Sequence, residues 1–73
     1  MTTTPQIIVS DRGGFYQIYR STPGQPIEWW SRRRSWLEAK RENVRYYSRF
    51  KTKGYAENDA AMLRGWMHKP IGQ

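Results

Sequence analysis

The fold is decided by residues 7–20, which read IIVSDRGGFYQIYR. The β-branched residues Ile7, Ile8 and Val9 favour a strand. Gly13 and Gly14 follow, and glycine supplies the positive φ that a tight turn requires. Beyond the turn, residues 15, 17 and 19 share one side of an extended chain and residues 16, 18 and 20 the other. The pattern predicts a β-hairpin over residues 6–20.

The segment after the hairpin is less decisive. Residues 21–26 contain two prolines and one glycine, which indicates a loop. Residues 27–30 (IEWW) fit either a third strand or the first turn of a helix after Pro26. Both alternatives stay open from the sequence.

Residues 35–52 carry two conflicting patterns. Ser35 and Glu38 match the capping box that begins a helix, and residues 36–52 divide into apolar and charged halves at helical spacing. Residues 44–51 also alternate with period two and are rich in aromatic side chains, which favours a strand. The preferred prediction is a short helix at 35–43 followed by an extended segment at 44–51, and a single helix throughout is the alternative.

The C-terminal part predicts a helix near residues 57–68. Gly54 is suited to end the element before it, and Asn58 or Asp59 can cap the helix start. At helical spacing one apolar face then contains Ala56, Ala60, Leu63 and Met67. The predicted fold is therefore α+β: a small antiparallel β-sheet, begun by the N-terminal hairpin and packed against a C-terminal helix.

The length of 73 residues allows one domain, 1–73, with a flexible arm at 1–5 and a flexible tail at 69–73. There is no cysteine to cross-link the chain, whereas four Trp, five Tyr and two Phe supply apolar surface. We expect most of these aromatic side chains to form the core. The chain is expected to be a monomer.

Residues with catalytic potential are scarce. His68 is the only histidine, and it lies more than two helical turns from Glu57 and Asp59. Glu38 and Glu42 are expected to form helical ion pairs with neighbouring arginines, and Gly13–Gly14 lacks the Lys-Ser/Thr partner of a phosphate loop. The sequence predicts no enzyme, no metal site and no cofactor.

The charge balance indicates a polyanionic partner. Thirteen Lys and Arg against six Asp and Glu give a net charge of +7 and a pI near 10.3. Residues 1–6 carry no positive charge, and no segment contains the ~20 apolar residues that span a bilayer. We expect a soluble protein of the cytoplasm, with no membrane partner.

Nine of the thirteen basic residues lie between positions 32 and 53, and Trp, Tyr and Phe are interspersed among them. Two functions fit this pattern: contact with nucleic-acid phosphates and bases, or docking onto an acidic protein surface. Three consecutive arginines repel one another, so packing does not account for the run at 32–34. The predicted partner-binding residues are Arg32, Arg33, Arg34, Arg41, Arg45, Arg49, Lys51 and Lys53.

The whole chain resembles the small transcription regulators of lytic Xanthomonas phages that bind RNA polymerase. The resemblance rests on the length, the Met1-Thr2-Thr3 start, the hairpin begun by Ile7-Ile8-Val9, the basic aromatic middle and the lack of cysteine. It implies a protein that binds host RNA polymerase near the RNA exit channel, inhibits initiation and promotes antitermination. Nascent RNA or DNA phosphates are further expected contacts, and direct DNA or RNA binding without polymerase is the alternative.

A local resemblance concerns residues 47–53, YSRFKTK, and the helix after them. They are similar to the last strand and helix of the three-stranded DNA-binding arms of phage integrases. This resemblance favours an extended conformation at 44–51.

Overall fold

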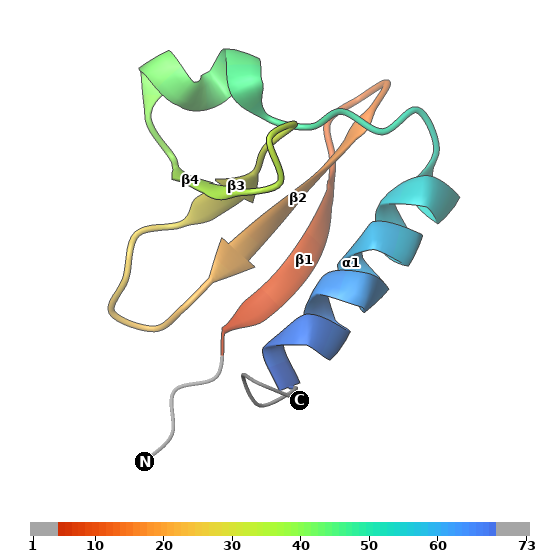
Figure 1. The fold of residues 1–73 in the computed structure, drawn as a ribbon. Coiled ribbons are helices and arrows are strands. Elements are labelled where there is room, and N and C mark those ends of the chain that lie inside the picture. Colours follow the sequence, from red (N-terminus) through yellow and green to blue (C-terminus); the bar gives the residue numbers. More distant parts are fainter. Residues whose placement is uncertain (1–4, 69–73) are drawn as a thin grey trace.

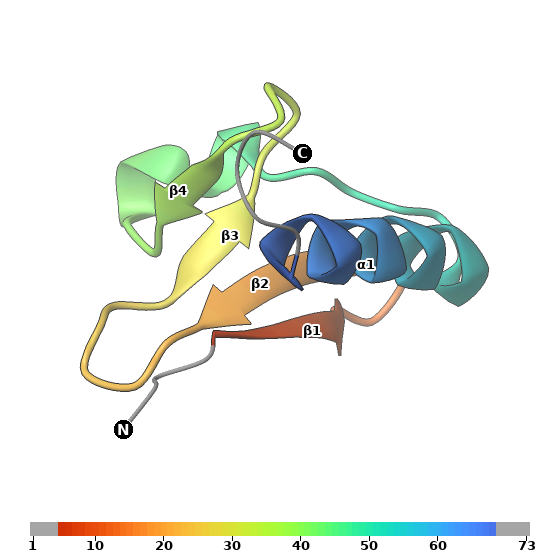
Figure 2. The same cartoon turned by 60° about the horizontal axis from the view of Figure 1, so that its bottom comes forward.

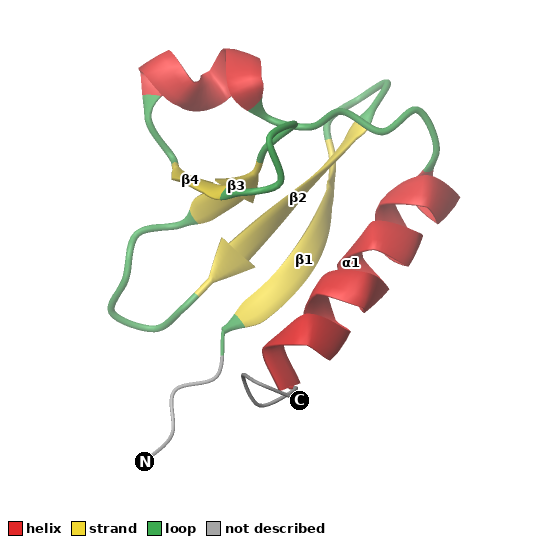
Figure 3. Cartoon of the chain, viewed as in Figure 1, coloured by secondary structure: helices red, strands yellow, loops and turns green. Residues whose placement is uncertain are grey.

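The computed structural model describes residues 5–68, with side chains through residue 65. Six elements follow one another: β1 (Gln6–Asp11), β2 (Tyr16–Ser21), β3 (Glu28–Trp30), β4 (Trp36–Glu38), the 3₁₀ helix η1 (Arg41–Tyr46) and α1 (Lys53–His68). The strands form one antiparallel sheet in the order β1-β2-β3-β4 (Figure 1). Helix α1 lies over β1 and β2 (Figure 2), and η1 lies next to β4 (Figure 3). The α+β prediction is confirmed.

The hairpin forms as predicted, because its turn is local. Arg12 N–H donates to the Phe15 carbonyl at 2.9 Å, and Gly13 and Gly14 adopt φ of 83° and 142°. Asp11 Oδ1 accepts the Gly13 N–H at 2.9 Å, as an Asx turn does. This closure sets the register in which Val9 faces Ile18 and Ile7 faces Arg20.

The core lies between one face of the sheet and α1. Alternate strand positions bring Ile7, Ile18 and Trp30 to this face, where they meet Ala60 and Leu63 of α1. The predicted helical face is confirmed for Ala56, Ala60 and Leu63, all buried, while the side chain of Met67 lies outside the described residues. The two alanines let α1 approach the sheet closely.

The prediction of a helix at 35–43, and its alternative of one helix over 36–52, are wrong. Trp36–Glu38 forms β4, and Trp36 pairs with Trp30 across the strands with ring centroids 5.1 Å apart. Cross-strand aromatic packing outweighs the capping-box pattern here. The open choice at 27–30 resolves as a strand, β3.

The prediction of an extended segment at 44–51 is only partly right, because η1 continues through Tyr46. Two isolated bridges, Ser31 with Tyr47 and Tyr16 with Phe50, show that residues 47–50 are extended. This segment continues the sheet beyond the short strand β3 and places Phe50 against the core.

Helix α1 begins at Lys53, four residues earlier than the predicted 57. Asn58 and Asp59 therefore lie inside the helix and do not cap it, and Gly54 belongs to its first turn. Thr52 takes the capping role, because its Oγ1 accepts the Tyr55 N–H at 3.3 Å. The predicted arm at 1–5 (apart from Pro5) and the tail at 69–73 lie outside the described residues.

Candidate binding surface

The arginine triplet lies in the exposed turn between β3 and β4. The turn closes through Ser31, which is 1% exposed. Ser31 N–H donates to the Ser35 carbonyl at 2.9 Å, and the two hydroxyls are 3.0 Å apart. Arg34 adopts φ of 59°, a left-handed conformation that is uncommon for a residue with a side chain. The turn thus holds three cationic side chains at the surface of the protein.

Tyr46 connects this turn with η1. The Arg32 N–H donates to the Tyr46 carbonyl at 3.0 Å. Two guanidinium groups lie over the Tyr46 ring, that of Arg33 at 5.6 Å and that of Arg45 at 5.0 Å from the centroid. Tyr46 remains 36% exposed. We call Arg32, Arg33, Arg34, Arg45 and Tyr46 the arginine–tyrosine cluster.

The period of η1 separates three rows of side chains. A 3₁₀ helix has three residues per turn, so every third residue shares a side. Arg41, Val44 and Tyr47 form one row and line a pocket of about 240 Å³. Asn43 and Tyr46 form a second row and line, with Arg33, a second pocket of about 260 Å³. Arg45 belongs to the third row, so Arg41 and Arg45 face different surfaces, although both were predicted to serve one site.

The other predicted contact residues lie apart from the cluster. The Arg49 guanidinium lies over the Phe15 ring at 4.8 Å, next to the hairpin turn. Lys51 and Lys53 are exposed at the entrance to α1. The structure therefore brings together Arg32, Arg33, Arg34 and Arg45 and leaves Arg41, Arg49, Lys51 and Lys53 outside that group.

Acidic side chains do not neutralise the cluster. Among the described residues the only ion pairs are Arg20–Glu28 and Lys40–Glu38. The second replaces the helical pairing predicted for Glu38, because Glu38 lies in a strand. Arg33 and Arg45 contact the Tyr46 ring, and all four arginines of the cluster are exposed without a carboxylate partner among the described residues, so their charge is available to a partner.

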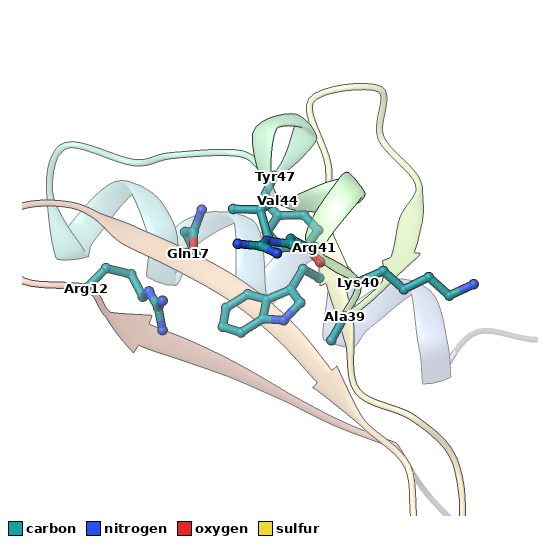
Figure 4. Close-up of a pocket in the computed structure, with 8 residues that line it drawn as sticks. Arg12, Gln17, Ala39, Lys40, Arg41, Val44 and Tyr47 are labelled. Carbon is teal, nitrogen blue, oxygen red and sulfur yellow. The ribbon is translucent and has the colours of Figure 1, made fainter.

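The first pocket, the one lined by Arg41, Val44 and Tyr47, includes residues that the sequence analysis did not predict to bind a partner (Figure 4). It lies on the sheet face opposite α1, where Gln17, Tyr19 and Trp29 project. The Trp29 ring contacts the rings of Tyr19 and Tyr47, with centroids 5.0 and 5.6 Å away, and the Arg12 guanidinium lies over it at 5.5 Å. We call the pocket that is lined by Arg12, Gln17, Trp29, Ala39, Lys40, Arg41, Val44 and Tyr47 the open-face pocket. The period-two pattern of residues 15–19 placed Gln17 and Tyr19 on one face, but nothing in the sequence placed Arg12 or Arg41 beside them.

Tyr47 lines the open-face pocket and connects the end of η1 to strands β3 and β4. It is 4% exposed, and its hydroxyl donates to the Glu38 carbonyl at 3.0 Å. Burial raises the pKa of Tyr47 above 10.0, and a backbone hydrogen bond from Lys40 offsets part of that rise. The phenol is therefore neutral and works as a donor.

The described side chains, residues 5–65, offer no metal site. This part of the chain contains no group of three or more His, Cys, Asp or Glu placed to hold a metal ion. No helix that the structure describes is both long and apolar enough to cross a membrane. The side chain of His68 lies outside the described residues.

No family model matches the sequence, and neither curated proteins nor solved structures give a significant match.

Proposed function

We propose that the chain is a phage-type transcription regulator that binds host RNA polymerase, inhibits initiation and promotes antitermination. The arginine–tyrosine cluster is the docking surface. The observation that carries this proposal is the contact of the Arg33 and Arg45 guanidinium groups with the exposed Tyr46 ring, without a neutralising carboxylate in the described residues.

The chemistry of the cluster suits an acidic protein surface. Arg and Tyr are among the residues that contribute most to binding energy at protein interfaces. The contact with Tyr46 restrains Arg33 and Arg45, so less side-chain freedom is lost when they bind. Their planar guanidinium groups can each pair with a carboxylate through two hydrogen bonds. These features, together with the resemblance of the whole chain, support polymerase as the partner.

The direct test is binding to purified RNA polymerase from a Xanthomonas host, after nuclease treatment, combined with a promoter-dependent transcription assay. We expect a stable complex and inhibition of initiation. Loss of the complex after nuclease treatment would indicate that nucleic acid bridges the two proteins, and would contradict the proposal.

Variants localise the surface. The double variant Arg33→Gln/Arg45→Gln should weaken polymerase binding by about 30-fold or more, as expected for interface residues of this kind. At Arg34 the suitable replacement is alanine, because its Cβ carries the same strain at a φ of 59° that arginine carries, whereas glycine would relieve that strain. The matched control is Lys53→Gln, which removes an exposed cation outside the cluster. Equal losses in the control and the double variant would refute a localised surface.

A further inference from the structure

We infer that the open-face pocket is a binding site for one base of a single-stranded nucleic acid, with the flanking phosphates held by Arg12 and Arg41. This site is separate from the arginine–tyrosine cluster and needs no polymerase. It therefore goes beyond the proposed function.

The pocket has three kinds of group that can recognise a nucleotide: an aromatic ring, cationic side chains and the amide of Gln17. Trp29 provides an aromatic surface, and base–aromatic stacking tolerates any base. Arg12 and Arg41 come from the hairpin turn and from η1, and neither forms an ion pair within the described residues. Among the described residues that line the pocket, Arg12, Lys40 and Arg41 are the charged ones, and none is acidic. Figure 4 shows Lys40 extending away from the pocket centre.

The buried but unpartnered side chain of Gln17 is the observation that points to a ligand. It is 5% exposed, yet its side-chain amide has no hydrogen-bond partner among the described side chains. No fully buried polar side-chain atom in the described part lacks a partner, so the Gln17 amide is not fully enclosed, and Gln17 lines the pocket. An amide offers both a donor and an acceptor, which are the groups needed to pair with the edge of a base.

The size of the pocket limits the ligand. Its volume of about 240 Å³ falls below the roughly 300–1,000 Å³ of sites for drug-sized ligands. A single planar ring fits this space better than a complete cofactor. In the unbound protein the Arg12 guanidinium lies over Trp29. A base that stacks on Trp29 takes that place, and the displaced guanidinium is then free to pair with a phosphate.

The test uses fluorescently labelled single strands of about eight nucleotides, one of uridylate and one of thymidylate, titrated by anisotropy at low and moderate salt. The uridylate and thymidylate arms separate RNA from DNA as the source of the base. Trp29→Leu and Gln17→Leu should each weaken binding about tenfold, since stacking and base-edge contacts are lost. They should leave the salt slope unchanged.

Arg12→Gln should act differently. It should reduce the slope of log affinity against log salt by about 0.7, the value for one phosphate contact on a single strand. Lys53→Gln is the matched control, because Lys53 is an exposed cation that does not line the pocket. If Lys53→Gln lowers affinity and slope as much as Arg12→Gln does, the attraction is unspecific and the site is refuted.

Amide NMR locates the contact independently of the variants, which guards against a variant that fails to fold. Titration with the strand should shift the Trp29 indole N–H and the Gln17 side-chain amide of the wild-type protein. Shifts confined to the arginine–tyrosine cluster would overturn the inference. So would pocket shifts produced by an acidic peptide and not by the strand, because they would assign the pocket to a protein partner.

Discussion

Tyr47 shows how one side chain supports two neighbouring parts of the surface. Its ring stacks on Trp29 at an interplanar angle of 23°, and its hydroxyl holds the Glu38 carbonyl. The Asn43 side-chain amide donates to the same carbonyl at 3.0 Å. Loss of the Tyr47 hydroxyl therefore removes one of the two side-chain hydrogen bonds between η1 and the end of β4. Helix η1 carries Arg41 toward the pocket and Arg45 toward the cluster.

The raised pKa of Tyr47 makes its contribution dependent on pH. A folded-state pKa above 10.0 means that this contribution is complete below about pH 10 and is lost as pH rises through the folded value. Tyr47→Phe should cost about 1 kcal/mol of unfolding free energy near neutral pH, since one hydrogen bond is lost. The difference between wild type and variant should shrink above about pH 10. Urea unfolding at a series of pH values measures it, and a constant difference would contradict the assignment.

The residues proposed to bind partners differ in how readily they are recognised in the sequence. Arg32, Arg33 and Arg34 are adjacent in the chain, so their excess charge is visible before any fold is known. Trp29, Gln17 and Arg12 are brought together by sheet register, and Arg41 by the period of η1. Neither the strand pairing nor the helical period of η1 can be recognised from neighbouring residues in the sequence. The open-face pocket was therefore found only in the structure.

The elements that could be predicted are those whose formation depends on residues close together in the sequence. The β1–β2 hairpin follows from its two-glycine turn, and α1 follows from its spaced apolar residues. Strands β3 and β4 have only three residues each, too few to display a period. Ser35 and Glu38 imitate a helix start, but the Ser35 hydroxyl pairs with Ser31 and Glu38 with Lys40. The cross-strand packing of Trp30 against Trp36 favours a strand over a helix at residues 36–38.

Helix α1 depends on small residues against the sheet. Ala60 is fully buried whereas its neighbour Ala61 is exposed. Ala60→Leu should destabilise the domain by about 1–3 kcal/mol through overpacking, and Ala61→Leu should change stability by less than about 0.5 kcal/mol. Thermal unfolding followed by circular dichroism compares the two. Similar losses in both variants would show that the helix does not pack through this face.

In the whole molecule, basic residues far outnumber acidic ones. A net charge of +7 on 73 residues repels itself in the folded state. The two ion pairs of the described residues, Arg20–Glu28 and Lys40–Glu38, are partly exposed and offset little of this repulsion. Stability should thus be lowest at low ionic strength, unless a polyanionic partner is bound.

Sodium chloride should therefore raise the melting temperature. Raising its concentration from about 0.1 M to about 1 M shortens the screening length from about 10 Å to about 3 Å. We expect Tm to increase by several degrees, because the positive surface charges then repel one another less. Differential scanning calorimetry measures the change. Lys53→Glu replaces a positive by a negative charge and should diminish it, and a fall of Tm with salt would contradict this account.

Arg64 has a consequence for the protein at high concentration. Its guanidinium donates to the Ile7 carbonyl through Nη2 at 2.7 Å and Nε at 3.2 Å. The Arg12–Phe15 hydrogen bond sets the pairing so that this carbonyl points away from β2, toward the side of β1 where no other described strand pairs. A free strand edge can recruit a strand of another molecule and begin aggregation. Arg64 occupies one acceptor of that edge and sets a charge beside it, so the same residue type that dominates the binding surface also opposes self-association of the sheet.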